Sequence, residues 1–60
     1  MEVKIGQKRQ FRTTGKIFVV LREKESPCKW LWVTKNELNG LEETHENNII
    51  ECFSDLIEEE

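Results

Sequence analysis

The chain has 60 residues, of which 37% are hydrophobic and 35% are charged, and its formal net charge is −3 at pH 7. A chain of this length forms a single domain, here residues 1–60, with a small core. Its longest apolar run, residues 17–21, is far shorter than the roughly 20 residues that span a bilayer. Signal-peptide and lipidation patterns are absent, so we expect a cytoplasmic protein without a membrane partner.

The charges are divided along the chain. The first 35 residues hold all nine basic residues and three acids, a net charge of +6, whereas the rest holds nine acids and no Lys or Arg, a net charge of −9. Three explanations follow: the basic part binds nucleic acid, the acidic part or a tryptophan-bearing strand binds a protein, or the two parts form ion pairs with each other. Exposed ion pairs contribute only ~0–1 kcal/mol each, so such pairing would affect specificity more than stability.

Few residues are suited to catalysis or metal binding. Cys28, Cys52 and His45 are the only residues of their types, and they lack the close CxxC or HxxxH pairs typical of zinc sites. A reducing compartment disfavours a disulfide, so we interpret both cysteines as small residues packed against the core. His45 lies in an acidic, polar stretch that suggests no pocket, and no glycine-rich phosphate loop occurs. We therefore expect no enzyme, no metal and no cofactor.

The first half of the chain has patterns typical of β-strands. Gly6, a turn over residues 13–16 and a turn at Pro27 separate short segments with alternating or continuous apolar residues. The segment over residues 17–21 is rich in β-branched and aromatic residues, which favour strands. The pattern predicts an antiparallel meander with strands over residues 3–5, 8–12, 17–21 and 28–33.

The dipeptide Asn39-Gly40 predicts a turn, because both residues tolerate positive φ. It closes a hairpin between residues 33–34 and 41–46 in one interpretation. In the other, Thr34 and Glu37 form a capping box and Gly40 ends a single helical turn. Both signals are satisfied if a short helical turn lies inside the hairpin loop.

The end of the chain allows two interpretations. The apolar residues have the spacing of a helix face over residues 49–57, with Asn48 as N-cap and Glu51 at the third helical position. Against this helix, glutamates would lie at its negative C-terminal end. The competing interpretation is a single turn over residues 48–50 followed by a closing strand over residues 51–57. The apolar residues are Ile49, Ile50, Phe53, Leu56 and Ile57.

The order of these features resembles small SH3-like barrels. The opening segment 3–7 leads to a basic strand, a glycine turn, an apolar strand, a tryptophan-bearing strand, Asn39-Gly40 and a closing apolar segment. It is similar to uncharacterised barrel proteins of phages and mobile elements, and more distantly to KOW- and Tudor-like modules. The resemblance implies a mainly β fold, a small antiparallel barrel of about five short strands with a helical turn. An α+β fold, a three- or four-stranded antiparallel sheet with a C-terminal helix 49–57, is the alternative.

Such barrels bind nucleic acid or protein and rarely catalyse, and no motif transfers a functional residue to this chain. Trp30 and Trp32 are two apart, so on a strand they share one face, opposite Leu31 and Val33. That strand is either covered on both sides or presents an exposed aromatic platform, and exposed aromatic residues mark binding sites.

The basic residues around the first hairpin, with Phe11 among them, suit phosphate neutralisation and base stacking, or they simply solvate and protect an edge strand. We expect a non-catalytic binding module with a protein partner, and a nucleic-acid-binding module is the alternative. The chain is expected to be a monomer or a weak homodimer. The candidate contact residues are Lys8, Arg9, Phe11, Arg12, Lys16, Arg22, Trp30 and Trp32.

Overall fold

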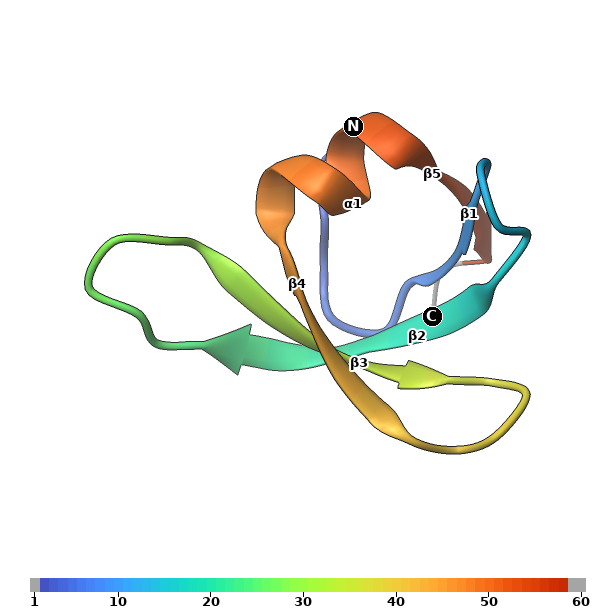
Figure 1. Ribbon diagram of the computed structural model, residues 1–60, viewed down its shortest axis with the longest axis horizontal. Coiled ribbons are helices and arrows are strands. Elements are labelled where there is room, and N and C mark those ends of the chain that lie inside the picture. Colours follow the sequence, from blue (N-terminus) through green and yellow to red (C-terminus); the bar gives the residue numbers. More distant parts are fainter. Residues whose placement is uncertain (1, 59–60) are drawn as a thin grey trace.

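Five antiparallel strands form one sheet, and a short helix connects the last two strands (Figure 1). The computed structural model describes residues 2–58. The elements are β1 (Lys8–Phe11), β2 (Ile17–Lys24), β3 (Leu31–Asn36), β4 (Glu42–Glu46), α1 (Asn47–Phe53) and β5 (Ser54–Glu58). The strand order is β4-β3-β2-β1-β5. The prediction of a mainly β fold with about five short strands and one helical element is confirmed, and the sheet is not closed into a barrel.

The first two connections follow from local sequence. Gly15 adopts φ +75° in the turn between β1 and β2, where the N–H of Phe11 donates to the carbonyl of Lys16 at 2.9 Å. The predicted strand over residues 17–21 is confirmed and continues to Lys24. The predicted strand over 28–33 is wrong for its first three residues, because β3 pairs with β2 only from Leu31 onward. Pro27 lies in the loop before it, where a missing N–H does no harm.

The hairpin and the helical turn predicted around Asn39-Gly40 are both present, but the predicted capping residue is wrong. A hairpin joins β3 to β4, and a helical turn lies in its loop, closed by a 2.8 Å bond from the N–H of Gly40 to the carbonyl of Asn36. Gly40 has φ +73°, a conformation that favours glycine. The residue that caps the turn is Asn36, whose side chain accepts from the N–H of Leu38 at 2.8 Å. The predicted cap, Thr34, is buried and donates to the carbonyl of Glu43 instead.

The predicted edge strand over residues 3–5 is not formed. Val3 enters the core, whereas Ile5 is exposed, so the alternation in this segment does not correspond to a paired strand. Both sides of β2 are occupied by β1 and β3. Residues 6 and 7 form two backbone hydrogen bonds with β2: the N–H of Gly6 donates to the carbonyl of Val20, and the N–H of Val20 donates to the carbonyl of Gln7, both at 2.9 Å.

The C-terminal segment is a helix followed by a strand. The continuous helix over 49–57, and with it the α+β alternative, is wrong, and the split interpretation has the right order with its boundary at Ser54 instead of Glu51. Ser54 is extended (φ −130°, ψ 154°), and both its N–H and its hydroxyl donate to the carbonyl of Ile50, which ends the helix. Glu46 occupies the N-cap position without a side-chain cap, so the prediction of Asn48 as N-cap is also wrong.

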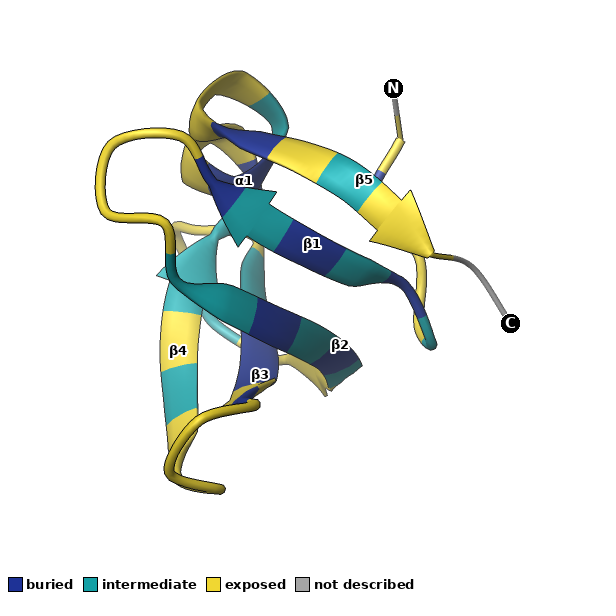
Figure 2. Ribbon diagram, turned by 90° about the vertical axis from the view of Figure 1, so that its right-hand side faces the viewer, coloured by how far each residue is buried: buried dark blue, intermediate teal, exposed yellow. Residues whose placement is uncertain are grey.

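The core lies on one face of the sheet, beneath α1. Buried residues alternate with half-buried ones along β1 and the first half of β2 (Figure 2), as expected for strands with one face turned inward. Among the described residues, no buried side-chain nitrogen or oxygen lacks a hydrogen-bond partner. The apolar core cluster consists of Val3, Phe11, Phe18, Val20, Trp32 and Ile50.

Candidate functional site

Ion pairs join the two oppositely charged parts of the chain. Within residues 2–58, each Lys or Arg pair links a base from the first 35 residues to an acid from residue 37 onward. The strand order explains this pairing in part, because the acidic strands β4 and β5 form the two edges of the sheet. The pairs are Lys8–Glu37 (2.8 Å), Lys8–Glu58 (3.3 Å), Arg12–Asp55 (3.2 Å), Lys16–Glu43 (3.2 Å), Arg22–Glu42 (3.0 Å) and Lys29–Glu46 (3.1 Å).

Three of these pairs change the pKa of a partner. Hydrogen bonds to Glu37 and then Glu58 raise the pKa of Lys8 above its ordinary 10.5. The hydrogen bond from Lys16 lowers the pKa of Glu43 below its ordinary 4.5. Both effects favour the charged forms, so a phosphate group that approached Lys8 or Lys16 would compete with a carboxylate already in place.

Arg9 is a core residue. The residue is 2% exposed, and its guanidinium group donates from Nε to Ser54 Oγ at 2.9 Å, from Nη1 to Gln7 Oε1 at 3.0 Å and from Nη2 to the carbonyl of Ser54 at 3.2 Å. Burial lowers the pKa of Arg9, and the charges of Glu51 and Asp55 oppose this shift. Arg9 therefore holds the junction of α1 and β5 against β1, and it is not accessible to a ligand.

The aromatic candidates are divided between core and surface. Phe11 is buried, and its ring centroid lies 4.8 Å from that of Phe18 and 5.1 Å from that of His45, which it meets edge to face. Trp32 is buried and donates its indole N–H to Asn47 Oδ1 at 2.9 Å. Trp30 precedes β3 and is 49% exposed, with its ring 5.9 Å from that of Trp32. Only Trp30 of the three aromatic candidates is accessible to a large partner.

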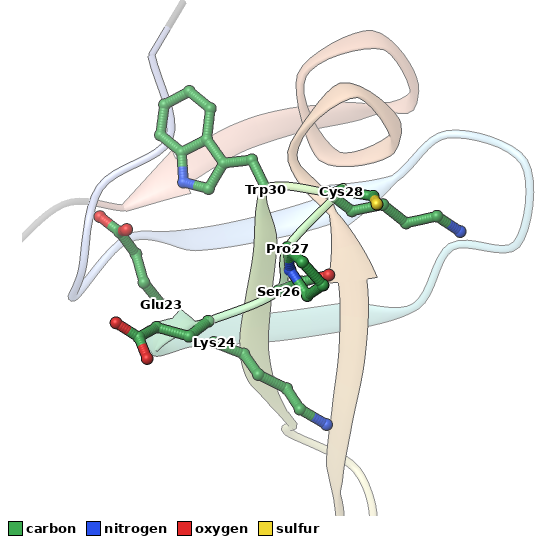
Figure 3. A pocket seen from close by; sticks show the side chains of 8 residues that line it. Glu23, Lys24, Ser26, Pro27, Cys28 and Trp30 are labelled. Atoms are coloured by element: carbon green, nitrogen blue, oxygen red, sulfur yellow. The ribbon is translucent and has the colours of Figure 1, made fainter.

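The loop between β2 and β3 surrounds an open hollow of about 780 Å³, lined by residues 23–30. In Figure 3, the ring of Trp30 projects to one side of the loop and Cys28 to the other. The labelled side chains spread outward from the loop and do not converge on one point (Figure 3). This hollow therefore lacks the convergent groups that a small-molecule site requires.

A second hollow lies between α1 and the turn that joins β1 to β2, and we call it the α1 hollow. It measures about 400 Å³, and its apolar lining residues are Phe11, Ile49 and Phe53. His45 and Lys16 also line it. Phe53 and Ile49 remain 48% and 39% exposed. The chain thus exposes two large apolar side chains at the edge of a concave apolar surface.

Sequence reasoning assigned Ile49 and Phe53 to the buried face of a helix. Of the three apolar side chains in α1, only Ile50 reaches the core, where it is fully buried. The spacing of these residues carries no signal that separates Ile50 from Ile49 and Phe53, because all three fit one apolar helix face. Ile49 and Phe53 are spaced i, i+4 and lie beside Ile50 on one apolar side of the helix, of which only the part at Ile50 faces the core.

Cys28 and Cys52 are free and exposed, so the prediction that they pack against the core is wrong. In the described part of the chain, no three His, Cys, Asp or Glu side chains are grouped to hold a metal ion. No helix within residues 2–58 is both long and apolar enough to cross a membrane. No protein-family model, curated protein or solved structure matches the chain.

Proposed function

We propose that this chain is a small non-catalytic binding module for a protein partner, which docks on the exposed side of α1 next to the α1 hollow. The observation that carries the proposal is the exposure of Ile49 and Phe53 at the edge of an apolar hollow. Exposed apolar groups gathered in one place and surrounded by polar residues are typical of protein-binding surfaces. Burial of such groups supplies most of the free energy of protein association.

The pattern of ion pairs favours a protein over a nucleic acid as the partner. Among the basic candidates, Arg9 is buried and Lys8, Arg12, Lys16 and Arg22 each contact a carboxylate. Nucleic-acid affinity depends on cations that neutralise phosphates, and cations that already bind carboxylates contribute less. Lys4, Lys24 and Lys35 form no ion pair within residues 2–58. Lys24 and Lys35 lie toward opposite ends of the ladder between β2 and β3, so these two do not form a joint phosphate site.

Two observations support a binding rather than a catalytic role. The ring of His45 packs against Phe11 and Phe18, and its Nε2 lies 3.4 Å from Glu43 Oε1. Neither cysteine lines the α1 hollow with it, so no thiol is placed for activation there. The resemblance to small SH3-like barrels, which bind rather than catalyse, stays part of this proposal. It is supported by the chain order of four strands, a helical element and a closing strand.

The test is a selection of displayed random peptides on the immobilised full chain, compared with two serine variants. Phe53→Ser removes an apolar group of the α1 hollow, and Leu41→Ser removes a more exposed apolar group outside it. We expect the wild type and Leu41→Ser to enrich the same peptides and Phe53→Ser to lose them. Labelled single-stranded and duplex oligonucleotides are titrated in parallel at about 50 mM salt. Salt-sensitive oligonucleotide binding without peptide enrichment would instead establish the nucleic-acid alternative.

A further inference from the structure

A third hollow adjoins the α1 hollow across the turn between β1 and β2. It measures about 550 Å³ and lies between this turn and the loop that joins β3 to β4, with Ile17 and Leu38 among its lining residues. Thr14 and Lys16 line both hollows. We call the combined surface the two-part groove. It runs from α1 over the β1–β2 turn to Leu38.

Each part of the groove has its own exposed apolar side chains. Phe53 and Ile49 flank the α1 hollow, and Leu38 flanks the other part with 95% of its surface exposed. Leu38 makes almost no contribution to the core, so its apolar surface is free for a partner. A ligand with one apolar group would leave one of the two parts solvated.

The charges that line the groove are already neutralised within the chain. Lys16 Nζ lies 3.2 Å from both carboxylate oxygens of Glu43, and Glu37 lies 2.8 Å from Lys8 Nζ. A charged ligand would lose its hydration here without gaining an unpaired counter-charge, because the lysine and the glutamate of the lining both have partners. An uncharged apolar segment loses little hydration and gains the burial of its side chains. The groove is therefore complementary to an apolar segment without charge.

We propose that the two-part groove binds an uncharged peptide segment of a partner protein through two large apolar side chains, one in each part. The segment crosses the β1–β2 turn above Thr14 and Lys16, the two residues common to both parts. This inference rests on the proposed function, since it specifies the chemistry of the protein segment that docks beside α1. Binding by both parts makes affinity depend on the spacing between the two apolar residues, which distinguishes this ligand from a merely hydrophobic one.

The probes are synthetic peptides with acetylated and amidated ends, in which Leu and Phe are separated by Gly-Ser spacers of increasing length. In matched peptides, Ser replaces one of the two apolar residues, or Lys and Glu are introduced into the spacer. Binding to the full ¹⁵N-labelled chain is followed by amide chemical shifts. We expect one spacer length to bind at least about tenfold more tightly than either peptide with a single apolar residue, because a second large side chain is buried. The amide chemical shifts of both Leu38 and Phe53 are expected to change on binding. The peptides with Lys and Glu in the spacer are expected to bind more weakly.

Three variants locate the two contacts. Leu38→Ser and Phe53→Ser each remove one apolar contact, and Leu41→Ser, at a site 63% exposed outside both hollows, is the control. Because all three side chains are exposed, we expect each substitution to leave the fold unchanged. The amide spectrum of each variant checks this. We expect Leu38→Ser and Phe53→Ser to lower the affinity of the best peptide to that of a peptide with one apolar residue. Leu41→Ser is expected to bind like the wild type.

The outcomes separate this inference from the proposed function. Peptide binding that Phe53→Ser abolishes and Leu38→Ser leaves unchanged would overturn the two-part groove and leave the proposed function standing. Binding of oligonucleotides alone, or of no peptide in the series or in the displayed library, would overturn both. Shifts at Leu38 and Phe53 that depend on protein concentration in the absence of peptide would identify a second copy of the chain as the occupant and overturn the inference.

Discussion

Trp32 donates its indole N–H to the side-chain oxygen of Asn47 at 2.9 Å, and both residues are buried. The amide nitrogen of Asn47 in turn donates to Glu51 Oε1 at 2.8 Å, one turn along α1. A helix of seven residues without a side-chain cap is too short to be stable alone. The hydrogen bond between Trp32 and Asn47 therefore connects the start of α1 to β3, and it positions the helix whose exposed side carries Ile49 and Phe53.

Replacement of Asn47 by alanine is expected to destabilise the protein by about 1–3 kcal/mol, because it leaves a buried indole N–H without an acceptor. Urea denaturation followed by tryptophan fluorescence measures the change in the free energy of unfolding. Asn48→Ala is the matched control, since Asn48 is the exposed neighbour in the same helix. Equal effects of the two substitutions would assign the loss to helix propensity and not to the contact with Trp32.

Arg9 allows a second matched comparison. Arg9→Met keeps most of the aliphatic volume but leaves Gln7 Oε1 and both oxygens of Ser54 without the donor they have now. We expect a loss of about 2–4 kcal/mol in the free energy of unfolding. Arg12→Met removes an arginine that is 56% exposed and pairs with Asp55, and it is expected to cost no more than ~0.5 kcal/mol.

Arg9→Lys tests whether geometry or charge matters at this position. A lysine keeps the positive charge but lacks the planar fork that contacts Gln7 and Ser54 simultaneously, so it is expected to recover only part of the loss. Thermal unfolding of the wild type and the two variants is expected to give midpoints that fall in the order wild type, Arg9→Lys, Arg9→Met. If Arg9→Met were as stable as Arg12→Met, the buried guanidinium group would have no structural role.

The sequence predicts those features of the fold that depend on local signals. The strand over residues 17–21, the turn at Gly15 and the hairpin at Asn39-Gly40 follow from β-branched residues or from turn residues, and all three are present. Trp30 shows where a local pattern fails. The alternation that paired it with Trp32 assumed a strand beginning at residue 28, but β3 begins at Leu31 and leaves Trp30 in the preceding loop.

The candidate site depends on contacts between distant parts of the chain, and local patterns do not contain them. Arg9 is recognised as a core residue only when Ser54, 45 positions away, is placed next to it. The choice of acid for each base likewise follows from the fold, because Lys16 reaches Glu43 across the sheet and not a neighbour in sequence. The separation of basic and acidic residues along the sequence predicts that ion pairs between the two parts can form. Which residues pair depends on the positions that the fold gives them.

Reversal of the charge at Glu42 tests the contribution of the ion pairs. Glu42 contacts Arg22 at 3.0 Å and lies opposite Lys35 in the ladder between β3 and β4, so Glu42→Lys places three cations together. We expect the free energy of unfolding to fall by about 0.5–1.5 kcal/mol at low salt, because the attraction to Arg22 is lost and repulsion between like charges is added. Glu25→Lys, at an exposed acid without an ion pair among residues 2–58, is the control.

Salt provides the second measurement for the same pair of variants. Screening weakens repulsion as well as attraction, so added NaCl is expected to narrow the stability difference between Glu42→Lys and the wild type. The difference is measured by urea denaturation at about 0.05 M and 1 M salt. A difference that does not change with salt would show that Glu42→Lys acts through packing or strand propensity and not through charge.

The Lys16–Glu43 pair predicts a loss of stability in acid. The pKa of Glu43 is lower in the folded chain than its ordinary 4.5, mainly because of the hydrogen bond from Lys16. Folding therefore favours the ionised carboxylate, and this contribution is fully present above pH 4.5 and is lost as the pH falls through the folded-state pKa. We expect Glu43→Gln to lose less stability than the wild type over this range. Glu25→Gln, at the exposed acid without an ion pair, is expected to keep the wild-type pH dependence.

The carboxyl group of Glu43 can also be followed directly by NMR. In the wild type it is expected to titrate below its ordinary pKa of 4.5, and Lys16→Met is expected to raise this pKa. A Glu43 carboxyl group that titrates at its ordinary value in the wild type would contradict the proposed role of Lys16.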